Sequence, residues 1–547
     1  MKETPVLIVG GGPVGLSFAI ALSRQGVGSM LVNDRTATTT HPKLDVVNTR
    51  SMEIFRQLGI SERIRDAGNP RTANQFAAIA ASAKGPYYTV LCDQNPCYLP
   101  VTEARTIIAK TIDGTLPLEP MQRIAQMNLE PVLLQIAMES DLIEVRFGWS
   151  LYGFEQDEDG VTARIHTVDG GRSEQVRCQY MVGCDGPNSR VRNFLNIDYE
   201  GTRDLVGELF IIHFRSDEVA DFYPNREPYW HTWICQPGYS GLLVSPDAGR
   251  NDFVLHRPFA PRKGETLESV IDRALGAKLN YEIVQSVPWR PQFLVASSFG
   301  RGRVFIAGDA THQYMPTGGL GMNTGLAEAH NLAWKLGATI KGWGGPKLLK
   351  SYETERLAVA RRNREHVKKC AAASFEAIFA RSDHMLDDSA AGIADRAAVA
   401  QDFETKTSRL YESLGAEIGY RYKSEIIVHD GQAADDDLEI RYHPTTLPGA
   451  RLPSSFLKDD RAIFDELCAS GLTLLAMGAA AVDCQPMNVA ARNAGVPLRT
   501  LAINEPHLAA LYGKRFVLVR PDQHVAWRGD AIPVDSRSII ETARGAA

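Results

Sequence analysis

Residues 5–34 read PVLIVGGGPVGLSFAIALSRQGVGSMLVND, and the order of features in this stretch decides the fold. Residues 5–9 form a short apolar run that suits a buried parallel strand. Three glycines follow in a G-x-G-x-x-G pattern, and an apolar helix continues to about Gly26, which suits a helix C-terminus. A second apolar strand, residues 29–33, ends at Asp34. Strand, glycine turn, helix, strand and acid in this order predict a doubly wound α/β domain that binds a dinucleotide.

Each glycine of this turn has its own physical role in the prediction. Gly10 permits the tight turn, Gly12 lets a pyrophosphate approach the backbone, and Gly15 allows the helix to pack closely on the strand. The N-terminus of the helix faces the phosphates, where its dipole favours negative charge. Asp34 follows Gly10 by 24 residues and can accept hydrogen bonds from a ribose, and Arg35 belongs to the same site. The alternative is a glycine-rich turn in some other α/β unit.

Composition and charge are those of an ordinary globular protein. The chain has 547 residues, of which 44% are hydrophobic and 23% charged, and its length predicts two or three domains. A formal net charge of -6 gives no reason to expect nucleic acid or an anionic membrane surface as a partner. The eight cysteines include no Cys-x-x-Cys pair, so no metal site or dithiol centre is predicted, and reduced thiols indicate the cytoplasm.

The uncharged residues 6–22 are not expected to be a targeting segment. Gly10 to Pro13 interrupt them, Glu3 precedes them in place of a basic region, and no small-residue cleavage pattern follows. No run of the sequence reaches the length of about 18 apolar residues that a membrane span requires. We therefore expect a soluble protein.

Two further glycine-containing motifs follow strand-like segments. They are residues 183–192, GCDGPNSRVR, and residues 302–325, GRVFIAGDATHQYMPTGGLGMNTG. In this order and spacing, and with the N-terminal turn, they resemble the single-component FAD-dependent aromatic hydroxylases, which have the fold of p-hydroxybenzoate hydroxylase. The sequence looks closest to the larger phenol and 2-hydroxybiphenyl hydroxylases and their polyketide-modifying relatives. The resemblance covers residues 5–370 with specific motifs.

The resemblance implies FAD in the N-terminal site, NADPH or NADH as the reductant and O2 as the oxidant. A flavin C4a-hydroperoxide would transfer oxygen to a phenolic or related aromatic ring, while the protein orients the substrate and excludes water. Baeyer–Villiger or epoxidising oxygenation of a polyketide- or quinone-type substrate stays open, because fold does not determine function. A flavin-dependent reductase and a non-enzymatic flavoprotein are further alternatives. The sequence names neither the substrate nor the choice between NADH and NADPH.

The resemblance also assigns cofactor roles to individual residues. The matching positions are Lys43, Gln126, Asp185, Gly186, Gly308 and Asp309. Asp185 and its glycine belong to a motif associated with both FAD and NAD(P)H, and Asp309 is expected to bind the ribityl chain. Gln126 matches a glutamine that lies along the FAD. Lys43 stands where the family usually has an arginine near the pyrophosphate, and this departure keeps the charge but loses the bidentate fork.

Apolar residues repeat at helical spacing from Leu320 to Ile340, so a long buried helix is predicted to begin near Gly319. Pro316 and the glycine pair before the helix leave backbone N–H groups at its positive end. This end suits the negative charge of a reduced flavin, and the glycines leave room for the isoalloxazine ring. The predicted contact segment consists of Pro316, Gly318, Gly319, Leu320, Gly321, Met322 and Asn323.

A general base is expected near the substrate, because deprotonating a phenol makes its ring more nucleophilic. Asp45 stands where the 2-hydroxybiphenyl enzymes carry a histidine near the substrate, although a surface or helix-capping role is equally open. His213, Tyr229 and His231 lie in segments that form the substrate-covering sheet in the family, and each histidine has a structural role as its alternative. With Pro316 at the flavin edge, these are the candidate catalytic residues, and none is assigned firmly as the base.

These patterns predict an α/β protein of several parts. Residues 1–180 and 280–345 form the doubly wound FAD-binding domain, and residues 185–285 form an inserted, mostly antiparallel substrate-binding sheet. Residues 346–435 are a helical segment and linker. Residues 440–547 alternate short strands and helices, and the resemblance implies a thioredoxin-like C-terminal domain without Cys-x-x-Cys. Its expected role is structural or at the interface of a homodimer.

Overall fold

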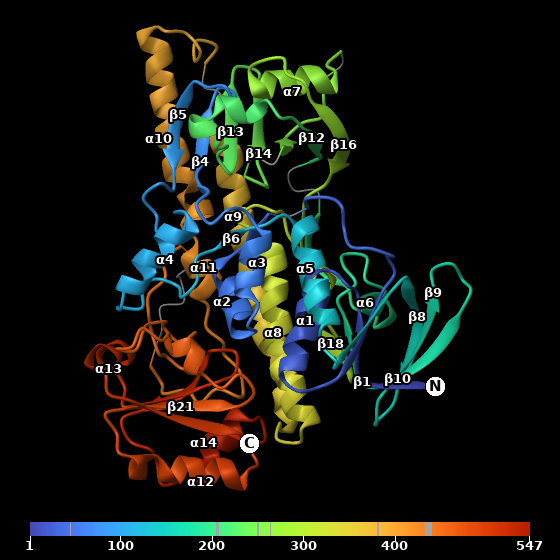
Figure 1. Cartoon of the computed structure of the whole chain (residues 1–547), viewed down its shortest axis with the longest axis vertical. Coiled ribbons are helices and arrows are strands. Elements are labelled where there is room, and N and C mark those ends of the chain that lie inside the picture. The colour runs from blue at the N-terminus through green and yellow to red at the C-terminus, as the bar shows by residue number, and fades with distance from the viewer. Residues whose placement is uncertain (44, 204–206, 249–250, 263, 380–381, 433–439) are drawn as a thin grey trace.

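A computed structural model describes residues 1–43, 45–203, 207–248, 251–262, 264–379, 382–432 and 440–547. Figure 1 shows three parts: an α/β body in the middle, a sheet-and-helix unit above it and a smaller α/β unit below it. The chain leaves and re-enters the body, so the body and the upper unit each combine segments that are distant in sequence. The linker predicted at the end of residues 346–435 falls mainly on residues 433–439 and lies outside the described residues.

An eight-stranded sheet forms the body, and its central strands are parallel, as the apolar runs predict. The strand order is β18 (Gly300–Arg301), β19 (Val304–Ile306), β10 (Ser173–Gly183), β1 (Lys2–Val9), β2 (Ser29–Asn33) and β7 (Ile143–Phe147), with β9 (Val161–Thr167) and β8 (Trp149–Gln156) attached to β10. The doubly wound fold is confirmed.

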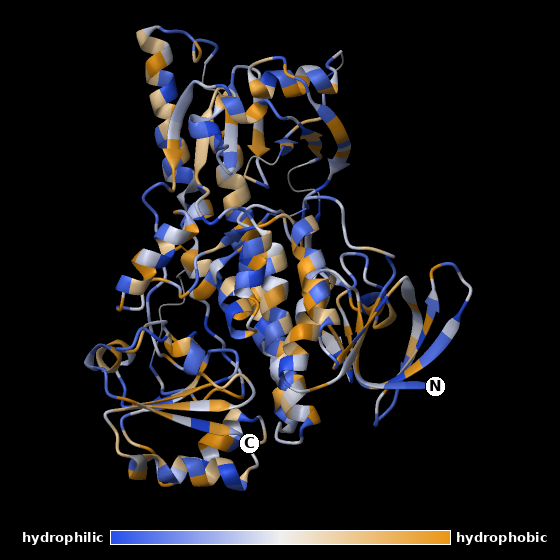
Figure 2. Cartoon of the chain, in the orientation of Figure 1, coloured by the Kyte–Doolittle hydropathy of each residue, from blue (hydrophilic) through white to orange (hydrophobic). Residues whose placement is uncertain are grey.

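Two helices pack together against this sheet and place the predicted cofactor segments. α1 (Pro13–Arg24) follows the glycine turn, and α8 (Leu320–Ile340) begins at the residue after Gly319, as predicted. α8 is buried on nearly all sides, including the charged Glu328 and Lys335. In Figure 2 this central helix carries polar and apolar residues alike, although the neighbouring elements cover it.

The upper unit of Figure 1 contains a seven-stranded sheet. Its order is β16 (Glu282–Trp289), β12 (Leu209–Arg215), β15 (Asp252–Arg257), β14 (Tyr239–Val244), β13 (His231–Gln236), β4 (Ala77–Ala80) and β5 (Tyr87–Leu91), and only β13 and β4 pair in parallel. The mostly antiparallel insertion is confirmed. Two of its strands come from residues 77–91, which the predicted domain ranges place in the body, so those ranges remain a proposal.

The two faces of this sheet have different neighbours. α7 (Leu267–Leu275) packs on one face, against residues such as Phe214 and Phe253. α9 (Pro346–Ala377) and α10 (Ala390–Tyr411) pack on the opposite face, which also turns toward the body. Side chains on this second face are therefore the ones that can meet a cofactor in the body.

The lower unit is the thioredoxin-like C-terminal domain. Its sheet has the order β22 (Leu498–Ile503), β21 (Leu472–Met477), β23 (Phe516–Val519) and β24 (Val525–Gly529), with β21 and β22 parallel. α12 (Gln485–Asn493), α13 (Pro506–Tyr512) and α14 (Ser536–Ala543) complete it. No disulfide joins any of the eight cysteines, all of which are described.

Buried charges attach this domain to the body. Glu53 of α2 (Thr49–Gln57) pairs with Arg451, and both side chains are almost completely buried. Glu355 of α9 accepts hydrogen bonds from Lys335 at 2.7 Å and from Arg520 at 2.6 Å, in a second fully buried group. These pairs join α2, α8 and α9 to segments around β23.

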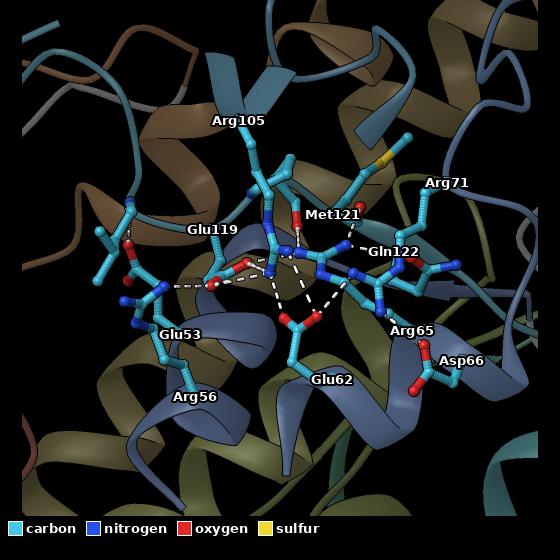
Figure 3. Close-up of polar contacts among 12 residues, drawn as sticks. Glu53, Arg56, Glu62, Arg65, Asp66, Arg71, Arg105, Glu119, Met121 and Gln122 are labelled. Atoms are coloured by element: carbon cyan, nitrogen blue, oxygen red, sulfur yellow. Dashed lines mark hydrogen bonds and ion pairs between the residues drawn. The ribbon is translucent and has the colours of Figure 1, made fainter. Parts of the chain in front are cut away.

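Figure 3 shows a neighbouring ion-pair network that holds residues 119–123 in place. Glu119 accepts hydrogen bonds from Arg56 of α2, Arg65 of α3 (Ser61–Ala67) and Arg105 of α4 (Val101–Lys110), at 2.7, 2.7 and 3.0 Å. Arg65 also donates to the carbonyl oxygen of Pro120 at 2.7 Å. The network fixes the chain just before Arg123, which lies in the candidate site.

The remaining α-helices and strands complete the fold. They are β3 (Val46–Val47) paired with β6 (Gln122–Arg123), α5 (Gln126–Met138), α6 (Arg190–Phe194), α11 (Leu414–Ile418), and the three strands β11 (Tyr199–Arg203), β17 (Gln292–Ala296) and β20 (His312–Gln313). Within the described part of the chain, no helix combines the length and apolar character needed to cross a bilayer.

Candidate active site

The glycine turn after β1 has the geometry that its sequence predicts. Gly10 has φ +112°, and a Cβ added there would lie 2.2 Å from the carbonyl oxygen of Cys184. A Cβ on Gly15 would lie 2.0 Å from the carbonyl oxygen of Gly10, so only glycine lets α1 approach β1 this closely. At Gly12, by contrast, no atom lies within 4 Å of an added Cβ. The strand–helix junction is tight inside and open outside, which supports the cofactor roles assigned to these glycines.

The ribose-binding candidates lie at the end of β2. Asp34 and Arg35 are both exposed directly after the strand, and the side chain of Asn33 accepts a hydrogen bond from the Gly11 N–H at 3.1 Å. Lys43 is exposed near this end of the site. Partial burial and the positive charge of Arg35 lower the pKa of the Lys43 ammonium.

Gln126 opens α5 and is held by its own helix. Its side-chain amide donates to Glu130 at 2.5 Å, and the other carboxylate oxygen of Glu130 accepts from the Thr39 N–H at 2.7 Å. Glu130 is buried, so this pair fixes the start of α5 against the loop after β2. The structure therefore orients Gln126, while its contact with a flavin stays a proposal.

Asp185 is largely occupied by contacts within the protein. Its carboxylate accepts hydrogen bonds from the Ser189 hydroxyl at 2.5 Å and from the N–H groups of Arg190 and Val191 at 2.7 and 3.2 Å. These contacts stabilise the start of α6, and burial raises the pKa of the Asp185 carboxyl. Gly186, with φ +80° and no atom within 4 Å of an added Cβ, is the open member of this motif.

Gly308 and Asp309 lie between the starts of α1 and α8. A Cβ on Gly308 would lie 3.1 Å from Val14 of α1, and the Gly308 N–H donates to Glu328 of α8 at 2.8 Å. The Asp309 side chain is exposed, yet the surrounding protein excludes enough water to raise the pKa of its carboxyl. An exposed carboxylate held between two helix starts can accept hydrogen bonds from a polyol chain.

The segment before α8 presents bare backbone. Gly318 and Gly319 have φ +84° and +62°, and no atom lies within 4 Å of a Cβ added to Gly318 or Gly321. α8 has no acidic residue in its first turn, so its positive end is not neutralised. Pro316 is exposed and Met322 is half-buried beside this end.

Leu320 and Asn323 turn into the protein at the same helix start. Leu320 is 2% exposed. The Asn323 amide donates to the carbonyl oxygens of Gly319 and Val46 at 2.6 and 3.2 Å, and its oxygen accepts from the Asn48 N–H at 3.0 Å. Both side chains hold the start of α8 in place, and the predicted contact of these residues with the cofactor stays a proposal.

These features fit a flavin dinucleotide. Two helix N-termini without acidic side chains in their first turns lie close together, because Val14 of α1 would contact an added Cβ at both Gly308 and Gly325. Gly12 before α1 and Gly318 before α8 have open space around an added Cβ, and the Asp309 carboxylate is exposed. Helix α1 can hold the pyrophosphate, and helix α8 can stabilise negative charge on a reduced flavin ring.

A group of side chains around Trp230 lies on the body-facing side of the seven-stranded sheet. We call Asp45, Arg123, Trp230, His231 and Tyr411 the Trp230 cluster. The Trp230 indole N–H donates to Asp45, its ring stacks on His231 with centroids 4.1 Å apart, and the guanidinium of Arg123 lies 5.6 Å from the ring. Asp45 is adjacent to Val46, whose side chain would lie 2.8 Å from a Cβ on Gly319. The cluster therefore borders the start of α8.

Burial determines the charge states in this cluster. It raises the pKa of the Asp45 carboxyl, although Arg123 and Trp230 oppose the shift. Burial lowers the pKa of Arg123 to about 10 and, with the charge of Arg123, holds the pKa of His231 well below its usual value. His231 is therefore neutral at neutral pH.

Two of the candidate catalytic residues lie outside this cluster. His213 is buried and its Nε2 lies 2.5 Å from Asp252, which also accepts from Arg215 at 3.0 Å. Tyr229 packs against the rings of Tyr87 and Tyr223, in the group of side chains on the α7 side of the sheet. The structure brings Asp45 and His231 together on Trp230 and gives His213 and Tyr229 local packing contacts.

Several residues of the site were not found from the sequence. Glu328 supports Gly308 from a part of α8 outside the predicted apolar stripe. Arg123 and His256 lie in segments without a motif, and burial lowers the pKa of His256 to about 4. Glu417 accepts hydrogen bonds from the Thr49 N–H and hydroxyl at 3.1 and 2.8 Å, and burial raises its pKa to about 7.

Fold and site together define a flavoprotein oxidoreductase. The family described as "FAD binding domain" matches residues 3–367, and "Aromatic-ring hydroxylase, C-terminal" matches residues 445–545. The chain belongs to this family of FAD-dependent aromatic-ring monooxygenases, which use NAD(P)H and O2. The resemblance inferred from the three glycine motifs is confirmed.

Individual relatives cover nearly the whole chain. The FAD-dependent monooxygenase apdD of Emericella nidulans is 32% identical over 96% of this chain and 88% of its own length. The 2,4-dichlorophenol 6-monooxygenase of Cupriavidus pinatubonensis is 29% identical over 99% of this chain and 96% of its own length. A structure titled "Native and K252c bound RebC-10x" has a TM-score of 0.89 and 32% identity, and each chain is covered completely.

Proposed function

We propose that the protein hydroxylates a phenolic ring held between the Trp230 cluster and the start of α8. The observation that carries the proposal is the position of Trp230, which contacts a carboxylate, a neutral imidazole and a guanidinium at once. These groups can remove the proton of a phenol, donate a hydrogen bond to its oxygen and stabilise the resulting negative charge. Bound FAD supplies the oxygen transfer itself.

Hydrogen bonding supports a proton on Nε2 of His231. The indole N–H of Trp233 donates to the Tyr411 oxygen at 2.7 Å, and Nδ1 of His231 lies 2.9 Å from the same oxygen. Tyr411 is 3% exposed, and no other described residue accepts its hydroxyl proton. A buried hydroxyl needs an acceptor, so Tyr411 donates to Nδ1 and the neutral ring carries its proton on Nε2. His231 thus offers an Nε2–H donor and is not the base.

Asp45 is then the base. Its Oδ2 accepts from Trp230, which leaves Oδ1 to take the phenol proton. Its raised pKa brings it closer to the working pH, where a general base is most effective. The phenolate oxygen would receive the Nε2–H bond of His231 and lie in the field of Arg123. His213 and Tyr229 are proposed to support the sheet, and Pro316 to border the flavin ring.

The first test measures NAD(P)H oxidation by the purified FAD-containing enzyme with a panel of phenols. The panel includes 2,4-dichlorophenol, the compound in the name of the Cupriavidus relative. We expect one class of phenols to stimulate oxidation and to yield a product heavier by one oxygen atom. A product with oxygen inserted beside a carbonyl group would contradict hydroxylation and indicate a Baeyer–Villiger reaction. Hydrogen peroxide as the sole product with every phenol would also contradict it.

Matched variants test the proposed roles. Asp45→Asn should lower kcat about 100-fold, while FAD content stays unchanged. His231→Gln presents an N–H at the Nε2 position and should keep much more activity than His231→Asn, whose amide reaches only the Nδ1 position. The reverse order would assign the proton to Nδ1 and make His231 the base. Tyr411→Phe should raise KM more than it lowers kcat, because Tyr411 acts only by positioning His231.

The place and assembly of the enzyme are also proposals. We propose that the enzyme works in the cytoplasm, because its eight cysteines are free thiols, as is usual in that compartment. We also propose that it forms a homodimer. Light scattering of the holoenzyme checks the mass, and a monomer at micromolar concentration would contradict the dimer.

A further inference from the structure

A second imidazole lies beside the Trp230 cluster on the body-facing side of the seven-stranded sheet. His231 of β13 is opposite Val244 of β14, and His256 of β15 is opposite Leu242 of the same middle strand. Opposite residues share a face of an antiparallel sheet, and so do residues two apart on one strand. Val244 and Leu242 both pack in the group of side chains that contains Trp230. His256 therefore faces the same side of the sheet as His231.

The His256 ring has no hydrogen-bond partner in the part of the chain that the structure describes. It is half-buried, whereas His213 on the next strand is bound to Asp252. Burial nevertheless lowers the pKa of His256 to about 4, so the open part of the ring lies among protein and not in bulk water. The neutral imidazole has one donor and one acceptor nitrogen. It can bind a hydroxyl or carbonyl group and offers no charge to a carboxylate.

The surface between the two imidazoles is apolar. Val244, Val254 and Leu242 form this strip, and all three belong to the group of side chains around Trp230. β13 and β15 are two strand spacings apart, about 10 Å, and the two histidines are offset along the strands by two residues, about 7 Å. Their Cα atoms are thus about 12 Å apart, and a hydrogen bond of about 3 Å at each end leaves room for two fused aromatic rings.

The two rings also affect each other electrostatically. A charge on His256 contributes to the lowered pKa of His231, after burial and the charge of Arg123. Coulombic interactions weaken with distance, so the two imidazoles face a common region.

We propose that His256 is a second polar anchor of the substrate site and selects a phenol of two fused rings with a hydroxyl or carbonyl oxygen at its far end. The inference rests on the proposed function, which places the reacting hydroxyl between Asp45 and Nε2 of His231. The far oxygen exchanges a hydrogen bond with His256, and the apolar strip holds the rings. Two anchors fix which ring carbon faces the flavin.

Equilibrium binding to the oxidised FAD enzyme, without NAD(P)H, tests the inference by titration calorimetry. Three matched probes are used: 2,6-dihydroxynaphthalene, 2-naphthol, which lacks the far hydroxyl, and 6-hydroxy-2-naphthoate, which has a carboxylate there. The dihydroxy compound should bind about five- to tenfold more tightly than 2-naphthol, because it makes one more hydrogen bond in a dry site. The carboxylate should bind no more tightly than 2-naphthol, because a neutral imidazole does not offset the loss of its hydration.

Variants at His256 separate a ligand contact from a structural role. His256→Leu should bind 2-naphthol within twofold of the wild type and lose the preference for the dihydroxy compound. His256→Gln keeps an N–H donor and should restore part of that preference, which a structural role alone would not do. His166→Leu is the matched control, since His166 lies on β9 outside the seven-stranded sheet, and it should leave the preference unchanged.

Equal affinities of the wild type for the two naphthols, or no binding of either, would overturn the inference, and this comparison does not depend on the folding of any variant. A preference that persists in His256→Leu would also overturn it, as would tightest binding of the carboxylate. Product analysis distinguishes this failure from that of the proposed function. Hydroxylation of single-ring phenols without any preference for the far hydroxyl removes the second anchor alone, whereas binding that depends on His256 without a hydroxylated product removes the proposed function alone.

Discussion

Glu53→Gln should destabilise the junction between the body and the C-terminal domain. The Glu53 carboxylate is buried in α2, and it receives hydrogen bonds from Arg451 at 2.8 Å, from Arg50 at 3.3 Å and from the Leu118 N–H at 2.8 Å. Glutamine keeps the shape but removes the only carboxylate that pairs with Arg451 among the described residues. The other near groups are the Tyr442 hydroxyl at 3.4 Å and the Phe464 ring at 4.7 Å.

The magnitude follows from leaving a charge buried. Removing one partner of a buried ion pair typically costs about 3–5 kcal/mol, because the remaining charge is uncompensated. Arg451→Met should cost less, since Glu53 would keep its contacts with Arg50 and the Leu118 N–H. In the double variant Glu53→Met with Arg451→Met no charge of the pair is left, and the cost should fall to about 1 kcal/mol or be absent.

Chemical denaturation of the holoenzyme provides the assay. The chain has several parts and is not expected to unfold in one step, so two probes are needed: flavin fluorescence for the body and hydrogen exchange of β21 and β23 for the C-terminal domain. The first loss should be exchange protection in the C-terminal domain. A cost below about 1 kcal/mol for Glu53→Gln, or a double variant as unstable as Glu53→Gln, would refute the reasoning.

Three further predictions follow from the site. Burial raises the pKa of Glu417 from 4.5 to about 7, so the stability that its carboxyl contributes is complete below about pH 4.5 and is lost as pH rises through about 7. Relative to the wild type, Glu417→Gln should therefore gain at most about 3 kcal/mol of folding stability between low and high pH, measured by denaturation midpoints. A pH profile of the variant that runs parallel to that of the wild type would contradict the shift. Gly12→Ala should fold normally and lose FAD affinity at least tenfold, because an added Cβ at this position meets no atom within 4 Å. Gly10→Ala should destabilise the apoprotein itself, because its added Cβ would overlap the backbone at Cys184. Equal melting temperatures of the two apoproteins would argue against this. Asp309→Ala should abolish FAD retention on gel filtration, and a variant with full flavin content would show that the ribityl contact is misplaced.

The sequence predicts most of the fold because periodicity and glycine spacing are local signals. The strand at residues 29–33 matches to the residue, and α8 begins at Leu320, next to the predicted Gly319. The predicted domain ranges placed β4 and β5 in the body, since both strands lie early in the sequence. They belong to the seven-stranded sheet because β4 pairs in parallel with the distant strand β13, a contact that sequence position does not indicate.

The site was less predictable, since it depends on contacts between distant segments. Asp45 and Arg123 meet because β3 pairs with β6, where Val46 is opposite Arg123. Neither residue is part of a motif that specifies this pairing. Tyr411 reaches His231 from the end of α10, a segment that the sequence marks only as helical. Charge states such as the neutral His231 depend on the burial that these contacts create.

α8 connects these parts of the protein. Its N-terminus provides the open glycines, and its third turn supports Gly308 through Glu328. Its later turns bind the C-terminal domain, where Asn331 donates to Asp522 at 2.9 Å. Buried polar side chains usually find hydrogen-bond partners, and each of these contacts helps to fix the position of the helix along its axis. The C-terminal domain therefore helps to place the helix end that we propose to face the flavin, although none of its residues belongs to the Trp230 cluster.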